Sequence, residues 1–341
     1  MGLFDKFLPK TLPMNVCMMG PRAVGKTTIL TAIFNDSQES IGAQTNLLLR
    51  AKGDTGDRLI GQKQMLNATF SNRTSITDIP QATLAASESV NLFEFGFGLK
   101  GRDSKIDLTL KDFPGEYVVS RPADVKSYID ESTAVLIAID TPHLMEAGGE
   151  FNRVKNKPDV ITGFFRDCLA NLSGEKLVLL VPLKCERYFY EGRMDEVLAA
   201  VKKSYEPLIN LFRESKKVAC AVTPILTLGG VEYDRFEETG GRVNINPITN
   251  TPARVLYRFR GEDAKYRPAF CVQPLYYTLS FLVAQYQRNK NSRSIFEKIM
   301  AMIFEKDTDL FDELYKMEKF RKTDLPGYEV VCGYDLFHYT K

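Results

Sequence analysis

Residues 20–27 read Gly-Pro-Arg-Ala-Val-Gly-Lys-Thr, a complete G-x-x-x-x-G-K-T pattern. The pattern stands between an apolar run, Asn15–Met19, and a helical pattern from Lys26 to Phe34. A chain of 341 residues contains such a string by chance in about one sequence in a hundred. A strand, a glycine-rich turn and a helix in this order offer a cradle of backbone N–H groups to a phosphate group. We call residues 20–27 the phosphate loop.

The residue types of the phosphate loop suit this chemistry. Glycines allow the backbone to approach a phosphate closely. Lys26 is expected to neutralise the β- and γ-phosphates of a nucleotide, and the Thr27 hydroxyl to ligate Mg²⁺. The predicted nucleotide-binding positions of this segment are Gly20, Ala23, Val24, Gly25, Lys26, Thr27 and Thr28.

Long apolar runs alternate with helical patterns further along the chain. The runs Ala134–Asp140, Lys176–Leu183 and Val218–Val222 are typical of strands that are buried on both faces. The helical patterns between them are Pro122–Asp130, Val160–Leu172 and Met194–Phe212. This alternation predicts a three-layer α/β fold, with a mostly parallel sheet between helices.

Two alternating runs, Val90–Phe97 and Lys105–Phe113, flank a turn that contains Gly and Asp. They predict a hairpin, so the sheet should contain one antiparallel strand. We divide the chain into a terminal segment, a nucleotide-binding domain with two long insertions, and a C-terminal helical extension. Their expected bounds are 1–12, 13–290 with insertions at about 36–89 and 227–269, and 291–341. Helices are expected at Pro274–Arg288, Ser294–Lys306 and Asp309–Lys319.

Composition excludes several function classes. Hydrophobic residues make up 44% of the chain and charged residues 26%, which is enough apolar material for a core. The net charge of +2 does not favour nucleic-acid binding. The segment Arg254–Arg260 interleaves arginines with aromatic residues, but we interpret it as a solvated edge strand. The presence of only two histidines nearly excludes a histidine zinc site and argues against a Ser-His-Asp hydrolase.

The six cysteines are scattered, without the clustering of a disulfide framework or a zinc ribbon. We interpret them as small buried hydrophobic residues in a reducing compartment. Every apolar stretch is far shorter than the roughly 20 residues that cross a bilayer. We therefore expect a cytoplasmic protein without a membrane span.

A second motif, Asp112-Phe113-Pro114-Gly115-Glu116, ends the run that alternates up to Lys111. D-x-x-G alone carries little information, because about one is expected in a chain of this size. Its place after a strand downstream of the phosphate loop gives it weight. Asp112 is predicted to reach Mg²⁺ through water, and the Gly115 N–H to contact the γ-phosphate. The alternative is an ordinary turn at the end of a strand.

Two further elements follow in order. Lys184-Cys185-Glu186 comes after a buried strand and resembles the guanine-specificity element N-K-x-D of GTPases, although Leu183 replaces Asn and Glu186 replaces Asp. The resemblance implies that Lys184 lies over the purine ring and that Glu186 accepts from guanine N1–H and N2–H. Thr223-Pro224 stands where GTPases place a loop that contacts the base through its backbone.

All four elements occur in the order found in GTPases, and the hairpin precedes D-x-x-G. The chain resembles P-loop GTPases of the translation-factor-like (TRAFAC) class over roughly residues 13–290, and within it the bacterial double-GTPase group. The strings that carry the finer resemblance are GPRAVGKTT, DFPGE, IDTP and TPILTLGGV. The resemblance implies a P-loop NTPase fold, Mg²⁺ as cofactor, GTP hydrolysis, GDP as product, and an activating or effector protein partner in a bacterial defence or conflict system.

GTPases hold Mg²⁺ and the γ-phosphate with a Thr on a loop between the first helix and the hairpin. The candidates are Thr69, Thr74, Thr77 and Thr83, and among them Thr74 and Thr77 are favoured, with Thr74 as the predicted metal ligand. Each alone also fits an ordinary loop threonine.

Three residues are predicted to serve catalysis, which in phosphoryl transfer is mostly positioning and charge neutralisation. Lys26 neutralises phosphate, Glu116 orients water and Arg22 places positive charge near the γ-phosphate. A surface role for Glu116 and a solvent-facing Arg22 are the alternatives, so slow intrinsic hydrolysis is expected. Two other functions stay open: a P-loop ATPase or kinase, and a nucleotide-bound scaffold with little hydrolysis. Dimerisation through the C-terminal helices is also an expectation.

Overall fold

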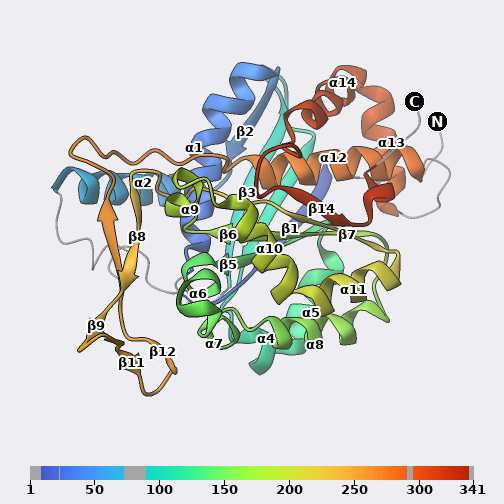
Figure 1. Ribbon diagram of the computed structural model, residues 1–341. Helices are drawn as coiled ribbons and strands as arrows, with labels where there is room; N and C mark the ends of the chain where they lie inside the picture. The colour runs from blue at the N-terminus through green and yellow to red at the C-terminus, as the bar shows by residue number, and fades with distance from the viewer. Residues whose placement is uncertain (1–8, 23, 73–89, 290–294, 338–341) are drawn as a thin grey trace.

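The computed structural model describes residues 9–22, 24–72, 90–289 and 295–337. In these residues, eight strands form one sheet in the order β14-β7-β6-β5-β1-β4-β3-β2 (Figure 1). The strands are β1 (Leu12–Met19), β2 (Leu47–Ala51), β3 (Asn91–Leu99), β4 (Ile106–Asp112), β5 (Ala134–Asp140), β6 (Lys176–Leu183), β7 (Val218–Val222) and β14 (Glu329–Cys332). The central strands β7, β6, β5, β1 and β4 are parallel, which confirms the predicted α/β class.

Helices cover both faces of the sheet (Figure 1). One face packs against α1 (Lys26–Gln44), α12 (Gln273–Arg288), α13 (Ile295–Lys306) and α14 (Thr308–Lys316). The other packs against α5 (Pro122–Glu131), α8 (Pro158–Leu169), α10 (Met194–Ser204) and α11 (Glu206–Ser215). Successive side chains of a strand point to opposite faces, so Val16 and Met18 join the first core while Cys17 and Met19 join the second.

Shorter helices lie in the connections. They are α4 (Tyr117–Ser120), α6 (Thr141–Met145), α7 (Asn152–Lys155), α9 (Glu186–Tyr190) and the 3₁₀ segments Glu146–Gly149, Met317–Phe320 and Tyr334–Leu336. Most of them follow a strand of the parallel set and therefore lie at the carboxyl edge of the sheet. Ligands of open α/β sheets bind at this edge.

The predicted hairpin is confirmed, since β3 and β4 pair antiparallel with Asn91 opposite Asp112. The polar region that follows the phosphate loop is more structured than we expected. The helix expected to end at Phe34 continues to Gln44, and β2 then pairs with β3 before α2 (Thr55–Asn72) begins. β2 is only five residues long, and Leu47 and Leu49 become buried because the hairpin provides a partner.

Two other expectations were wrong in detail. The segment 291–341, expected to be helical, also contributes β14, which pairs antiparallel with β7 and gives the sheet a second antiparallel strand. The helix expected over Met194–Phe212 is divided between α10 and α11. Pro207 stands in the first turn of α11, where its missing N–H needs no partner.

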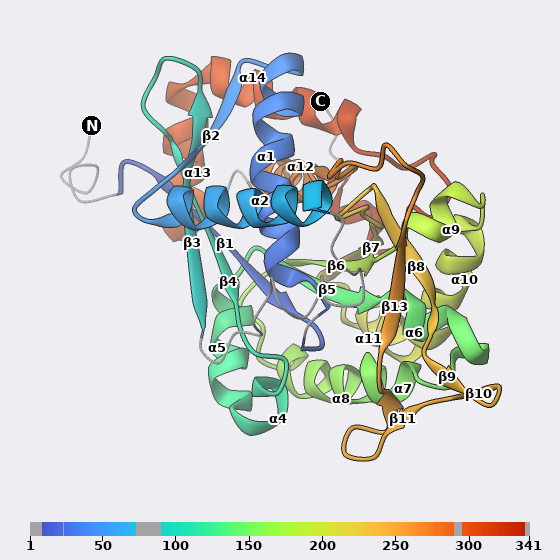
Figure 2. The ribbon, with the colours of Figure 1, turned by 90° about the vertical axis from the view of Figure 1, so that its left-hand side faces the viewer.

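Residues 227–269 form the expected excursion from the sheet. β8 (Val231–Phe236) and β13 (Val255–Phe259) pair antiparallel, and beyond them lie two small pairs, β9 (Glu238–Thr239) with β10 (Arg242–Val243) and β11 (Ile245–Asn246) with β12 (Thr251–Pro252). Figures 1 and 2 show this hairpin beside the main sheet. Arg258 and Arg260 both pair with Glu232 on the neighbouring strand, so their charge is partly balanced within the hairpin.

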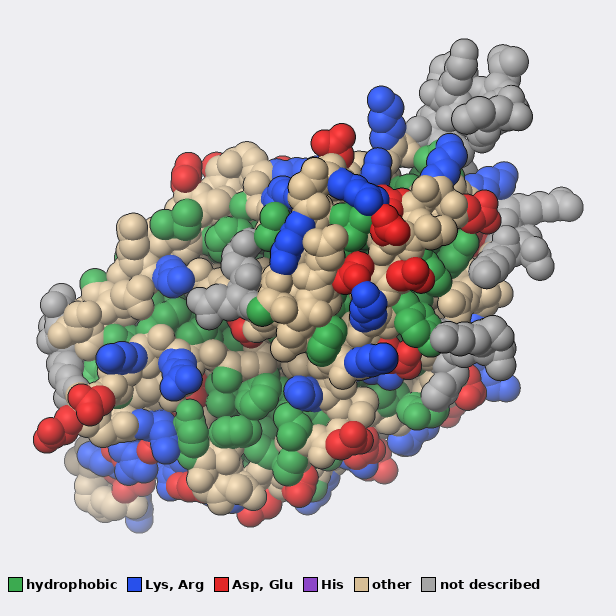
Figure 3. Space-filling view, turned by 90° about the horizontal axis from the view of Figure 1, so that it is seen from above, with side chains coloured by type: hydrophobic (Ala, Val, Ile, Leu, Met, Phe, Trp, Pro, Cys, Tyr) green, Lys and Arg blue, Asp and Glu red, His purple; other side chains and the backbone are tan. Residues whose placement is uncertain are grey.

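The core contains the residues expected there. All six cysteines are buried as free thiols, and the aromatic side chains Tyr276, Tyr277, Phe281 and Tyr286 of α12 are buried as well. On the face seen in Figure 3, basic and acidic side chains are interspersed, in keeping with the small net charge. Within the described ranges, no helix has the length and apolar character needed to cross a membrane.

Candidate functional site

The phosphate loop joins the end of β1 to the start of α1, as its motif predicts. Gly20 and Gly25 have backbone φ values of 145° and 108°, which residues with a side chain rarely adopt. A β-carbon added at Gly20 would also come within 2.8 Å of the Ala138 backbone and side chain on β5. The loop therefore needs glycine at both positions. Ala23 lies outside the described residues.

Lys26 and Thr27, the first residues of α1, both face Asp112 at the end of β4. Lys26 Nζ lies 3.8 Å from Asp112 Oδ1 and donates to the carbonyl of Gly20 at 3.3 Å. The Thr27 hydroxyl donates to Asp112 Oδ2 at 3.5 Å. The fold thus brings together the predicted residues of two motifs that are far apart in sequence.

Burial disfavours the charged forms of both Lys26 and Asp112. Burial lowers the pKa of Lys26, and the nearby Asp112 carboxylate only partly opposes this effect. Burial likewise raises the pKa of Asp112, although Lys26 and Thr27 act in the opposite direction. Buried groups with perturbed pKa values in one cluster are typical of functional sites.

The same residues fit a magnesium ion. Asp112 Oδ1 is buried and has no hydrogen-bond partner among the described residues. A carboxylate oxygen and a threonine hydroxyl are hard oxygen ligands of the kind that Mg²⁺ prefers, and Mg²⁺ usually completes its shell with water and phosphate oxygens. No cluster of three or more His, Cys, Asp or Glu residues that could hold a metal ion occurs in the described part of the chain.

The D-x-x-G turn lies directly against the phosphate loop. A β-carbon added at Gly115 would overlap the carbonyl oxygen of Gly20, so the two backbones are in close contact. Glu116 follows at the start of α4 and is exposed. Its carboxylate is close enough to Lys26 to raise the pKa of that lysine, against the larger effect of burial.

Lys184 forms a buried ion pair at the ends of β5 and β6. Its ammonium group lies 2.7 Å from Asp140 Oδ2, and His143 Nδ1 lies 2.6 Å from the other carboxylate oxygen. Burial alone would raise the pKa of Asp140, but Lys184 and His143 hold it well below its ordinary value. Burial acts to lower the pKa of Lys184, but attraction and hydrogen bonding to Asp140 and Tyr257 together outweigh it and raise that pKa.

Asp140 was not among the predicted site residues. The available signal was an acidic residue that ends a continuous apolar strand. Lys184 itself has a left-handed backbone, with φ of 60°, which is uncommon for a residue with a side chain. Asp140 thus holds the predicted base-contacting lysine in one orientation at the carboxyl edge of the sheet.

Glu186 is placed differently from what its predicted role suggests. Its side chain is 2% exposed, and Oε1 accepts the backbone N–H groups of Leu228 and Gly229, at 2.8 and 3.2 Å. Burial raises the pKa of Glu186, while these two hydrogen bonds act in the opposite direction. The carboxylate therefore anchors the start of the 227–269 excursion.

Thr223 and Pro224 lie at the end of β7, on the same edge as Lys184. The Thr223 N–H donates to the carbonyl of Leu180, and its buried hydroxyl has no hydrogen-bond partner among the described residues. The same holds for the Thr28 hydroxyl. The Pro224 carbonyl accepts from the Tyr328 hydroxyl.

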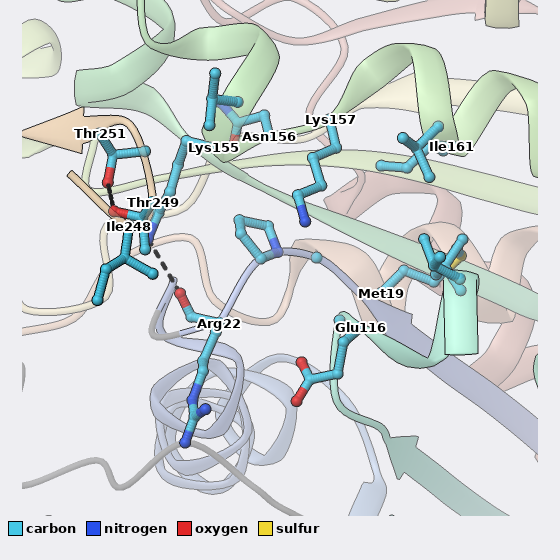
Figure 4. A pocket seen from close by; sticks show the side chains of 17 residues that line it. Met19, Arg22, Glu116, Lys155, Asn156, Lys157, Ile161, Ile248, Thr249 and Thr251 are labelled. Atoms are coloured by element: carbon cyan, nitrogen blue, oxygen red, sulfur yellow. Dashed lines mark hydrogen bonds between the residues drawn. The ribbon is translucent and has the colours of Figure 1, made fainter. Parts of the chain in front are cut away.

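A cavity of about 420 Å³ lies beside the phosphate loop (Figure 4). Gly20, Pro21, Arg22, Gly115 and Glu116 line one side of it. Its other walls come from the end of β1, α4, the segment around α7 and α8, and β12 with the loop before it. They are Met19, Val118, Val119, Val154, Lys155, Asn156, Lys157, Val160, Ile161, Ile248, Thr249 and Thr251. The two residues predicted to act in catalysis, Arg22 and Glu116, thus share this cavity.

The predicted switch threonines are mostly not placed. Thr69 belongs to α2, and its hydroxyl donates to the carbonyl of Met65 within that helix. Thr74, Thr77 and Thr83 lie outside the described residues, so the choice of Thr74 as a metal ligand stays a prediction.

Comparisons with known proteins give little beyond these observations. No protein-family model matches the chain, and no curated protein matches it. Among solved structures, the chain is similar to the Ski7 GTPase-like domain of S. cerevisiae in two crystal structures. The structure bound to GDP and inorganic phosphate has a TM-score of 0.41 and 14% identity, over 85% of this chain and 52% of that one. The structure bound to GTP has a TM-score of 0.38 and 12% identity, over 67% of this chain and 45% of that one.

The chain spans about half the length of these solved chains. At such TM-scores and identities, the likeness assigns neither a family nor a function to this chain. The resemblance to the double-GTPase group stays a prediction from the sequence motifs.

Proposed function

We propose that this protein binds GTP together with Mg²⁺, hydrolyses it to GDP and phosphate, and acts as a nucleotide-dependent switch. The observation that carries the proposal is the meeting of Lys26 and Thr27 with Asp112, while Gly115 lies against Gly20. Two motifs with separate roles toward one triphosphate thus share one edge of the sheet.

Each residue has a role in this proposal. Lys26 and the N–H groups at the start of α1 bind phosphate oxygens, and the Gly115 N–H faces the γ-phosphate. Thr27 and Asp112 would hold Mg²⁺, with Asp112 acting through water. When bound, Mg²⁺ neutralises charge on the phosphates. Glu116 orients the attacking water, and Arg22 adds positive charge from the cavity side.

Base recognition falls to Lys184, Glu186 and the backbone after β7. In this proposal the side chain of Lys184, whose ammonium group pairs with Asp140, lies against the face of the purine. Glu186 Oε1 already accepts two backbone N–H groups, so only Oε2 is left for guanine. We therefore expect GTP to bind more tightly than ATP, but with a smaller preference than a fully free carboxylate would give. This occupancy also favours a second candidate, an NTPase without guanine preference.

We propose slow intrinsic hydrolysis that a protein partner accelerates. The exposed Glu116 is a carboxylate beside anionic phosphates, which is unfavourable unless a positive charge offsets it. The motif resemblance supports a bacterial defence or conflict system as the setting of this switch.

Competition binding tests the function most directly. A fluorescent GTP analogue is titrated with the wild-type protein in the presence of Mg²⁺ and then displaced with GTP, GDP or ATP. We expect displacement by GTP and GDP at lower concentrations than by ATP, and loss of binding in Lys26→Ala. Equal displacement by ATP would support the second candidate, and binding that survives Lys26→Ala would overturn both. Multiple-turnover phosphate release then separates a GTPase from a nucleotide-bound scaffold.

A further inference from the structure

A lysine from outside all four motifs holds the phosphate loop. Lys155 is the last residue of the short helix α7, and its Nζ donates to the backbone carbonyl of Arg22 at 3.1 Å. The dashed line that ends at Arg22 in Figure 4 marks this hydrogen bond. Lys155 and Arg22 are 133 residues apart in sequence, so only the fold brings them together.

Two asparagines fix the position of Lys155. The Asn156 side chain accepts the Asp140 N–H at 2.8 Å and donates to the Asp140 carbonyl at 3.1 Å. Both hydrogen bonds attach it to the backbone at the end of β5. It also donates to Asn152 Oδ1, and Asn152 in turn donates to the Ser204 hydroxyl. Both asparagines are buried. The chain is therefore fastened to β5 just after Lys155 and to α10 just before it, which positions Lys155 beside the phosphate loop.

Lys155 also belongs to a group of cations at this edge of the sheet. Burial lowers the pKa of Lys155, and the positive charges of Lys184 and Lys26 lower it further, while Asp140 opposes them. The positive charges of Lys184 and Lys26 are therefore unfavourable for a charged Lys155 in the free protein. An anion among them would relieve the repulsion.

We propose that Lys155 is a positioning residue of the nucleotide site, which holds the Arg22 carbonyl away from bound phosphates and adds positive charge from outside the phosphate loop. A carbonyl oxygen that turned toward a phosphate would repel it, whereas the N–H groups of the loop attract it. The inference rests on the proposed function only for the nature of the ligand, a nucleoside di- or triphosphate, and not on which base it carries.

Lys155→Met tests this role, because methionine keeps an unbranched side chain but has neither charge nor donor. We expect the dissociation constants for Mg²⁺–GTP and Mg²⁺–GDP to rise about 10-fold, as for the loss of one charge-assisted hydrogen bond. Lys155→Arg keeps the charge and the donors, so it should restore most of the affinity. In turnover assays, the loss should appear mainly in KM.

Arg153→Met is the matched control. Arg153 lies on the same helix, its side chain is 80% exposed, and it pairs with the exposed Asp159 at the surface. This variant should bind nucleotide as the wild type does. Thermal unfolding without nucleotide should give the same midpoint for Lys155→Met and Arg153→Met, within a few degrees.

Wild-type affinity in Lys155→Met, or equal losses in Lys155→Met and Lys155→Arg, would overturn the proposal. So would a loss of affinity that matches a large fall in the unfolding midpoint, since it would show a purely structural role. A wild-type protein that binds ATP but not GTP would contradict the proposed function and leave the proposal for Lys155 standing. The affinity of Lys155→Met would then be measured for Mg²⁺–ATP.

Discussion

Gly115 lies so close to Gly20 that a β-carbon added to it would overlap the carbonyl oxygen of Gly20. This contact joins the D-x-x-G turn after β4 to the phosphate loop after β1. Because β1 and β4 are neighbouring parallel strands, both turns leave the sheet at the same edge. Any group bound in the phosphate loop is therefore within reach of the Gly115 backbone.

Gly115→Ala should weaken nucleotide binding at least about 10-fold and destabilise the protein by about 1–3 kcal/mol, because backbone must move to admit the methyl group. Titration with a fluorescent nucleotide and urea unfolding measure the two effects. Gly163→Ala in α8 is the control, since nothing lies within 4 Å of its added β-carbon. It should leave binding unchanged and the stability equal or up to about 1 kcal/mol higher. Equal behaviour of the two variants would contradict the close contact.

Nucleotide affinity should fall as the pH rises through the lowered pKa of Lys26. Anionic phosphates bind the ammonium form, so affinity is full below this pKa and is lost above it. Binding at alkaline pH should also take up protons, because the phosphates raise the pKa again. Calorimetry in two buffers of different ionisation enthalpy measures the uptake. A flat affinity profile from neutral pH to pH 10 would speak against a buried, phosphate-binding Lys26.

Lys184→Met should destabilise the free protein by about 3–5 kcal/mol, because it leaves the buried Asp140 carboxylate without its 2.7 Å ion-pair partner. Urea unfolding without nucleotide measures the loss. Lys202→Met removes a pair with Glu329 in which both side chains are about 40% exposed, and it should change stability by no more than about 1 kcal/mol. Similar losses in both variants would show that the Lys184–Asp140 pair is not critical.

Glu186→Ala should destabilise the free protein by about 1–3 kcal/mol, since it leaves the N–H groups of Leu228 and Gly229 without an acceptor. Glu186→Gln keeps an oxygen for them and should lose less. The ratio of GTP to ATP affinity, measured in both variants, tells whether the carboxylate also contacts the base. A stability of Glu186→Ala equal to wild type would refute the anchoring role.

The sequence was enough to predict the strands of the central sheet and the edge on which the site lies. Continuous apolar runs such as Ala134–Asp140 are buried on both faces wherever they pack, so their local pattern identifies them. The phosphate loop could be predicted for a related reason. The glycines, Lys26 and Thr27 are neighbours in the sequence, so the motif itself largely determines the conformation of the loop.

The edge strands could not be predicted in the same way. β2 and β14 are five and four residues long, and each is a strand because β3 or β7 offers a free edge to pair with. Edge strands of this length have too few residues to show a period. Their conformation depends on a partner that is distant in sequence.

The sequence by itself determined the glycine, lysine and threonine spacing of the phosphate loop and the order of the motifs along the chain. Only the tertiary structure decided that Glu186 anchors Leu228 and Gly229, that Asp140 orients Lys184, and that Lys155 reaches the carbonyl of Arg22. The physical reason is the range of the interactions. Backbone geometry and hydrophobic period are set by near neighbours in the chain, whereas the partner of a buried charge is whichever group packing brings within hydrogen-bond distance.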